Sequence, residues 1–193
     1  MPDKGEIMRS ITMEIDGKAV SASEGMTVLE VAREAGIDIP TLCYNEQLKP
    51  SGVCRMCMVE IVKGKRRRVV ASCCYPAEDG LVVATNTPKI HKIRRMIIEL
   101  LWPAWGELGK QYGITKSRFV PQLTDCSLCG LCVHYCAEVA KKNALYFQGR
   151  GINRRVAFIP GIADCDSCRE CFGLCTGGWI VAEHGRASAT LND

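Results

Sequence analysis

The sequence predicts an α+β protein made of two cysteine-rich modules that are joined by a helix. Strand patterns, one short helix and a cysteine-containing loop fill the first part of the chain. Apolar residues then recur at helical spacing after Pro88. Further on, a run of four cysteines appears twice, with matched positions 39 residues apart, from Cys126 and from Cys165. We therefore expect a first domain at residues 1–87, a connector helix and linker at 88–120, and a second domain at 121–193.

The cysteine content indicates a metal protein. The 193 residues include 13 cysteines, and 47% of the chain is hydrophobic and 24% charged, which is a globular composition. A disulfide scaffold is disfavoured for three reasons. The cysteine count is odd, and the first ten residues lack the apolar stretch of a signal peptide. A chain of this length can also bury enough surface to be stable without disulfide bonds. We expect reduced thiolates that bind metal, in a cytoplasmic protein.

Neither a membrane nor a nucleic acid is expected as a partner. The most apolar run, at 96–105, is short, contains Glu99 and is interrupted by Pro103, so no membrane span is predicted. The net charge is only +4. A basic run at 63–68 fits a solvated hairpin turn best, with docking on an acidic partner as the alternative. No nucleic-acid recognition motif accompanies that run.

The first domain is predicted to begin with a hairpin and a capped helix. Residues 10–22 alternate apolar and polar positions around the tight-turn dipeptide Asp16-Gly17. Thr27 and Glu30 then form the capping-box pattern that opens a helix, and Gly36 is placed to end it. Further strands are expected at 58–62, 68–71 and 81–85. This order is typical of a small α+β domain in which one helix lies across a mixed sheet.

The connector helix is expected from Pro88 to about Leu101. Proline suits the first position of a helix, and apolar residues recur over the next three turns as a stripe. The stripe would pack on the two domains of this chain or on another subunit. Residues 106–120 are expected to be a linker. The opposite, polar face of the helix is expected to hold Lys89, Lys92, Arg94, Arg95 and Glu99.

The two C-terminal cysteine runs share the spacing C-x2-C-x2-C-x3-C, which bacterial ferredoxins use for two cubane clusters. Three close thiolates can bind three irons from one loop, whereas the fourth, at the start of the following helix, ligates the other cluster. The spacing therefore predicts two crossed [4Fe–4S] sites. The first set is Cys126, Cys129, Cys132 and Cys175, and the second is Cys136, Cys165, Cys168 and Cys171.

Two details qualify this pattern. Ala137 and Thr176 stand where a proline usually follows the fourth cysteine, although neither change removes a ligand. A pair of zinc sites is the alternative for the same thiolates, but two complete four-cysteine runs favour iron–sulfur clusters. Between the runs, residues 145–148 and 155–159 are expected to pair as a hairpin.

A third group of cysteines, Cys43, Cys54, Cys57 and Cys73, lies in the first domain. Four thiolates with one close pair and two outliers can hold a binuclear cluster on a loop beside a sheet. Zinc stays open as an alternative from the residues alone. A Rieske centre is disfavoured because the three histidines lie in no suitable arrangement.

The sequence around these cysteines resembles one modular family of iron–sulfur proteins. The family includes the N-terminal part of the large iron–sulfur subunit of complex I, [FeFe]-hydrogenases, and the diaphorase subunit of NAD-linked [NiFe]-hydrogenases and formate dehydrogenases. The resemblance covers nearly the whole chain. It is carried by Pro40-Thr41-Leu42-Cys43, by Cys54-Arg55-Met56-Cys57-Met58-Val59-Glu60, by Ala71-Ser72-Cys73 with Glu78-Asp79-Gly80-Leu81-Val82-Val83, and by later motifs such as Ser117-Arg118-Phe119.

This resemblance implies a β-grasp [2Fe–2S] ferredoxin-like domain followed by a bacterial-type two-[4Fe–4S] ferredoxin domain. It also makes Cys73 the fourth [2Fe–2S] ligand, because Cys73 lies seven residues before Gly80. Cys74 would then be a spare, small buried thiol. The chain departs from the family in one respect. The stretch between Leu101 and Phe119 contains no cysteine, so we expect the usual middle cluster, with one histidine and three cysteine ligands, to be missing.

Three predicted clusters, with no motif for substrate chemistry beside them, indicate an electron-transfer subunit. The sequence contains no nucleotide-binding glycine motif and no hydrolytic triad, so the chain is not expected to be catalytic alone. The resemblance implies a soluble hetero-oligomer with an NAD(P)H-linked flavoprotein subunit and a catalytic redox subunit, such as a hydrogenase, a formate dehydrogenase or another low-potential oxidoreductase. Electron bifurcation by such a complex is compatible with the sequence, although no residue requires it. The alternatives are a free-standing ferredoxin-like electron carrier and a zinc-stapled binding module.

Overall fold

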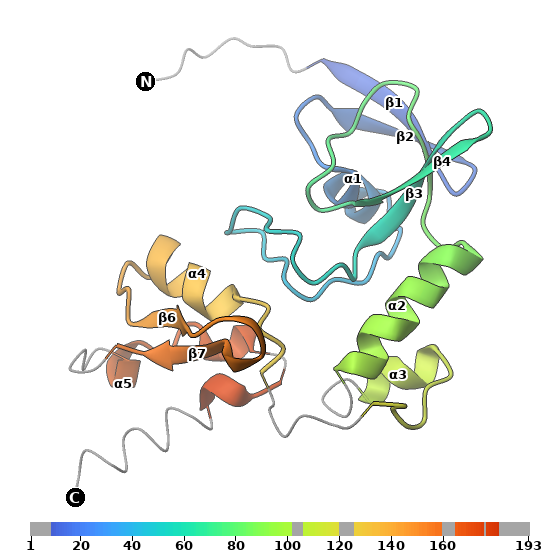
Figure 1. Cartoon of the computed structure of the whole chain (residues 1–193). Helices are drawn as coiled ribbons and strands as arrows, with labels where there is room; N and C mark the ends of the chain where they lie inside the picture. Colours follow the sequence, from blue (N-terminus) through green and yellow to red (C-terminus); the bar gives the residue numbers. More distant parts are fainter. Residues whose placement is uncertain (1–8, 102–105, 120–125, 160–164, 176, 182–193) are drawn as a thin grey trace, which may run out of the picture. The chain divides into compact units, whose positions relative to one another are not determined.

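The chain divides into two compact units, Met1–Leu42 with Ser51–Ile97, and Cys43–Pro50 with Ile98–Asp193. The domain bounds expected from the sequence differ from this division and stay a prediction. No helix in the described parts of the chain is long and apolar enough to cross a bilayer. The structure, a computed structural model, describes residues 9–101, 106–119, 126–159, 165–175 and 177–181 (Figure 1).

The first unit is built on a five-stranded mixed sheet with the strand order β2-β1-β5-β3-β4. β1 and β5 run parallel, whereas the other neighbours are antiparallel. Each strand predicted from the sequence is present, and a mixed sheet with few helices fits a [2Fe–2S] ferredoxin-like domain. The strands are β1 (Ser10–Ile15), β2 (Lys18–Ser23), β3 (Met58–Lys63), β4 (Arg66–Ala71) and β5 (Val82–Ala84).

Helix α1 (Val28–Glu34) lies beside this sheet (Figure 1). Its predicted capping box is confirmed: the Thr27 amide donates to Glu30 Oε2 at 2.7 Å, and the Glu30 amide donates to Thr27 Oγ1 at 3.3 Å. Gly36, with φ at +70°, follows the end of the helix as predicted. The apolar side of α1 is fully buried through Val28, Leu29, Val31 and Ala32.

The basic run at 63–68 is only partly a turn. The turn itself is Gly64-Lys65, and the three arginines that follow belong to β4, an edge strand of the sheet. Arg67 pairs there with the buried Glu60 of β3, at 3.3 Å. A row of charges on an edge strand hinders edge-to-edge pairing with other chains. The predicted solvated hairpin tip is therefore confirmed, and its basic residues continue into the edge strand β4.

Helix α2 (Pro88–Leu100) has the predicted bounds, and Lys89, Lys92 and Arg95 are exposed as predicted, but two other residues of the predicted polar face are buried. Arg94 and Glu99, expected on the polar face, are only 3% and 5% exposed, whereas Leu100 of the apolar stripe is 59% exposed. Arg94 lies one turn after the buried Ile90, so it shares the buried row of the helix. Both charged side chains are buried because backbone or side-chain partners far away in the sequence satisfy them.

In the second unit, Glu99 is held by the segment that precedes the undescribed residues 120–125. Its carboxylate accepts hydrogen bonds from Arg118 Nε at 2.7 Å, from Arg118 Nη2 at 2.8 Å and from the Arg118 amide at 3.0 Å. Ser117 Oγ donates to the Glu99 carbonyl at 2.8 Å. A short helix, α3 (Gly106–Gln111), lies where only a linker was expected. Its two glycines and its short length explain why the pattern predicted no helix.

The rest of the second unit is a small core around a hairpin. The antiparallel pairing of β6 and β7 confirms the predicted hairpin. Leu145, Val156 and Ile180 are buried there together with several cysteines, and Phe158 stacks on Trp179 with ring centroids 6.4 Å apart. The elements are α4 (Leu131–Glu138), β6 (Leu145–Gln148), η1 (Gly151–Asn153), β7 (Arg155–Phe158), α5 (Cys165–Cys168) and η2 (Phe172–Leu174).

The repeat in the sequence is only partly a repeat in the structure. Cys136 was expected to begin a helix, but α4 begins at Leu131 and contains Cys136 near its end. The helix begins early because Gly130, in a left-handed conformation with φ at +81°, turns the chain into it. Arg169, the matched position of the second run, also has a positive φ, at +47°. The turn after the second cysteine is therefore shared by both runs.

Candidate metal centres

The β3–β4 hairpin brings two cysteines of the first domain together. Met58 pairs with Ala71 in the sheet register, so Cys57 and Cys73 flank the open end of the hairpin. Their Sγ atoms are 3.4 Å apart, and the residues are only 1% and 2% exposed. The buried Ser72 fixes this end, because its amide and its hydroxyl donate to the Cys57 carbonyl at 3.1 and 2.8 Å.

The loop before β3 is folded tightly around Cys54. Arg55 has a left-handed conformation, with φ at +59°, and the Met56 amide then approaches Cys54 Sγ at 3.4 Å. Gly52, also left-handed with φ at +62°, could take a side chain only if Cys74 moved, since a Cβ atom there would lie 2.9 Å from Cys74 Sγ. Amides directed at sulfur and close backbone packing are features of iron–sulfur loops, so these residues fit a cluster.

The pair of thiols is electrostatically suited to a metal. The hydrogen bond from Cys57 and burial both raise the pKa of the Cys73 thiol well above its ordinary value. Two adjacent buried thiols resist ionisation unless a positive charge compensates them, and a coordinated metal supplies that charge. Without a metal, we therefore expect the Cys73 thiol to be protonated at neutral pH.

The remaining two cysteines of this region differ in their placement. Cys43 is buried in the segment Cys43–Pro50, which belongs to the other compact unit, so its role as a ligand stays a prediction. Cys74 is exposed, with its Sγ atom 3.5 Å from that of Cys73. The expectation that Cys74 is buried was wrong. In this turn Cys73 is buried, and the next residue faces solvent.

The first run of cysteines forms a mutually interacting group in the second unit. Burial raises the pKa of the Cys132 thiol to about 12, and Cys129, Cys171, Cys126 and Cys175 add to the shift. Burial also raises the pKa of Cys126, to which Cys129 and Cys175 contribute, although a backbone hydrogen bond lowers it in part. The four cysteines of the predicted first set thus lie within electrostatic reach of one another.

The second run shows a corresponding group. Burial raises the pKa of the Cys171 thiol to about 11, and Cys136, Cys165 and Cys168 contribute further. The Ala144 amide donates to Cys136 Sγ at 3.2 Å. These neighbours of Cys171 are the other members of the predicted second set. Which thiol ligates which cluster stays a prediction.

The thiols do not converge on a single point. Within the part of the chain that the structure describes, no three histidine, cysteine, aspartate or glutamate side chains are grouped closely enough to hold one metal ion. A cubane cluster does not require such convergence, because each of its irons takes a separate thiolate.

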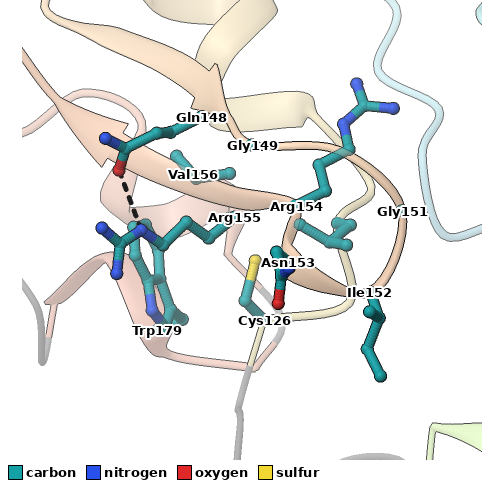
Figure 2. A pocket seen from close by; sticks show the side chains of 11 residues that line it. Cys126, Gln148, Gly149, Gly151, Ile152, Asn153, Arg154, Arg155, Val156 and Trp179 are labelled. Carbon is teal, nitrogen blue, oxygen red and sulfur yellow. Dashed lines mark hydrogen bonds between the residues drawn. The ribbon is translucent and has the colours of Figure 1, made fainter.

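A cavity of about 650 Å³ lies beside Cys126 (Figure 2). Figure 2 shows Cys126 between Trp179 and Asn153 of the turn that joins β6 to β7. Arg155 Nε donates to Gln148 Oε1 at 2.8 Å on the wall of this cavity. One member of the predicted first set is therefore reached from a cavity with a basic wall.

Sequence reasoning missed one residue of the first unit, Arg94. Its guanidinium donates to the carbonyls of Met56 and Met58, on either side of Cys57. No local pattern signals this contact, because the two carbonyls lie 38 and 36 residues away in the sequence.

Comparison with known proteins agrees with this geometry. Residues 8–88 match the family model described as a 2Fe-2S iron–sulfur cluster binding domain. The NADH-ubiquinone oxidoreductase 75 kDa subunit of Reclinomonas americana is 31% identical over 178 residues, which cover 76% of this chain and 26% of that protein. The mitochondrial NADH dehydrogenase iron–sulfur protein 1 of Solanum tuberosum is 32% identical over 177 residues, or 76% of this chain and 24% of that protein. The chain thus spans about a quarter of the length of these relatives.

A solved structure gives a more extensive match. A chain of the NAD⁺-reducing [NiFe]-hydrogenase, crystallised in its H2-reduced state, superimposes with a TM-score of 0.70 at 30% sequence identity. The match covers 79% of this chain and 76% of that chain.

Proposed function

The chain belongs to the family of [2Fe–2S] iron–sulfur proteins that includes the N-terminal region of the NADH-ubiquinone oxidoreductase 75 kDa subunit and a chain of the NAD⁺-reducing [NiFe]-hydrogenase, and on that basis we propose that it relays electrons between two other subunits. The proposed donor or acceptor on one side is an NAD(P)H-linked flavoprotein subunit. On the other side is a catalytic redox subunit, such as a hydrogenase, a formate dehydrogenase or another low-potential oxidoreductase. The proposed complex is cytoplasmic, and electron bifurcation is one form that its activity can take.

One observation carries this proposal. The match to the hydrogenase chain extends over 79% of this chain, whereas the [2Fe–2S] family model matches residues 8–88, so the match includes far more than the [2Fe–2S] domain. An electron-transfer subunit is therefore better supported than a [2Fe–2S] domain that is fused to a domain of unrelated function. The cysteines support the same view, because they occur in three sets along the chain and no other catalytic motif accompanies them.

We assign the cluster ligands as the sequence predicts. Cys43, Cys54, Cys57 and Cys73 would hold a [2Fe–2S] cluster, and the two C-terminal sets would each hold a [4Fe–4S] cluster in the crossed arrangement. Clusters of this kind take up and release single electrons. The chain supplies the thiolates, the amide donors to sulfur and a largely water-excluded surrounding, which together adjust the cluster potentials.

Metal analysis of the full chain tests the assignment. Protein purified without oxygen should contain about ten irons per chain and an equivalent amount of acid-labile sulfide, because one [2Fe–2S] and two [4Fe–4S] clusters are proposed. Stoichiometric zinc in place of iron would refute the cluster assignment.

The native complex, isolated from its source through a tag on this chain, should contain a flavoprotein and a catalytic redox subunit. A monomeric native protein would favour a free-standing ferredoxin-like carrier instead.

Three single variants test the crossed ligation. Cys136→Ser should lose the same [4Fe–4S] EPR signal as Cys168→Ser, because both residues are assigned to one cluster. Cys129→Ser should lose the other signal and keep the first. If Cys136→Ser instead matches Cys129→Ser, each run binds its own cluster and the crossed assignment is wrong. Cys74→Ser, which changes a cysteine outside the three sets, is the matched control and should retain all signals.

A further inference from the structure

We propose that Arg94 is a positioning residue and buried counter-charge for the [2Fe–2S] centre. The inference rests on the proposed ligand set, and it adds a residue from outside that set. Arg94 comes from α2, which contributes no predicted ligand, and lies 37 residues beyond Cys57 in the sequence.

The guanidinium of Arg94 brackets a proposed ligand. Nε donates to the Met56 carbonyl at 3.1 Å, and Nη2 donates to the Met58 carbonyl at 2.9 Å. These are the two residues adjacent to Cys57, so the carbonyls of both neighbours of the ligand are held by one rigid, planar group. Met56 and Cys57 are 0% and 1% exposed, and Met58 is half-buried, so most of the bracketed segment is shielded from water. Arg94 thereby fixes the direction in which the Cys57 thiolate leaves the chain.

The charge of Arg94 also needs compensation. Arg94 is 3% exposed and carries a permanent positive charge, which is costly to bury without an opposite charge. Among the described residues, no carboxylate forms an ion pair with it, whereas Arg67 and Arg118, whose side chains are exposed, pair with Glu60 and Glu99. Carbonyl dipoles alone offset the charge of Arg94 in part.

A cluster held by Cys57 and its partners supplies the missing negative charge. A [2Fe–2S] centre bound by four thiolates is an anion. When it takes up one electron from a flavoprotein or a chemical reductant, one ferric iron becomes ferrous, no covalent bond changes, and the centre becomes more negative by one charge. A buried cation stabilises that reduced form, since charges interact more strongly in a low-dielectric interior than in water. Arg94 should therefore raise the reduction potential of the centre.

The experiment is a redox titration of the full chain, followed by the EPR signal of the reduced [2Fe–2S] centre. Arg94→Gln removes the charge and keeps a hydrogen-bond donor, whereas Arg94→Lys keeps the charge. Arg95→Gln removes the same charge from an exposed position of the same helix and is the matched control. We expect Arg94→Gln to titrate at a lower potential than the wild type, with Arg94→Lys and Arg95→Gln close to the wild type.

Each other result has a definite meaning. Wild-type protein without a [2Fe–2S] signal would refute the proposed function. A wild-type potential in loaded Arg94→Gln, or an equal fall in Arg94→Lys, would overturn only this inference, because the charge would have no effect of its own. If Arg94→Gln takes up no [2Fe–2S] cluster, loading of Arg94→Lys supports the counter-charge, and failure of both variants to load overturns it. The [4Fe–4S] signals report whether the variants remain folded.

Discussion

The tight turn at Gly52 offers a direct test of how the [2Fe–2S] loop is packed. A Cβ atom at this position would lie 2.9 Å from Cys74 Sγ, closer than side chains normally approach. Gly80 has a similar backbone conformation, with φ at +71° against +62° for Gly52, but no atom lies within 4 Å of the corresponding Cβ position. The two alanine variants therefore share the backbone cost and differ in the contact.

The expected magnitudes follow from these two contributions. An alanine in the left-handed conformation costs about 1–2 kcal/mol, which is all that Gly80→Ala should lose. Gly52→Ala should lose about 0.5–1.5 kcal/mol more, because the inserted atom forces the exposed Cys74 side chain away from its preferred position. A difference of about 1.4 kcal/mol corresponds to a tenfold change in an equilibrium or a rate. We therefore expect the two variants to differ by about twofold to tenfold.

The assay is the rate at which the full chain loses its [2Fe–2S] EPR signal in a fixed concentration of guanidinium, without oxygen. The loop must open before the cluster is released, so destabilisation of the folded loop appears in this rate. Gly52→Ala should lose the signal faster than Gly80→Ala. Adding Cys74→Ala should return Gly52→Ala to the rate of Gly80→Ala, since the next atom, Ala71 Cβ, is at an ordinary 3.8 Å. Equal rates for the two glycine variants, or no rescue, would refute the reasoning.

Three further outcomes are expected. Cys74→Ala should keep the [2Fe–2S] EPR signal and Cys73→Ala should abolish it, whereas the reverse result would place the fourth ligand one residue later. Gly149→Ala should raise hydrogen exchange across the β6–β7 hairpin by destabilising it by about 3 kcal/mol, because a Cβ atom would overlap the Asn153 carbonyl oxygen; unchanged exchange would contradict this. In iron-free protein, the folded chain holds the Cys132 proton up to a pKa of about 12, whereas the unfolded chain releases it near 9.0. The free energy of unfolding, measured with urea, should therefore fall from pH 9 to pH 12 and not remain constant.

Local signals in the sequence determined most of the first unit. The capping box at Thr27 and the Asp16-Gly17 turn act through neighbouring residues, so they specify α1 and the first hairpin without help from the rest of the chain. The cysteine spacings likewise predicted three groups of thiols. Caps and tight turns depend on contacts between residues that are close in the sequence, so they can be predicted from the sequence.

Tertiary structure alone decided which charges are buried. The sequence places Arg94 and Glu99 among the polar residues of α2, and a pattern of apolar and polar positions assigns every charge to solvent. Arg94 is buried because carbonyls 36 and 38 residues away accept its hydrogen bonds, and Glu99 because Arg118, 19 residues away, donates to it. The same holds for Cys57 and Cys73, which a hairpin register brings together. The desolvation of a charge or thiol is offset only by partners that folding brings close, and local sequence contains no record of them.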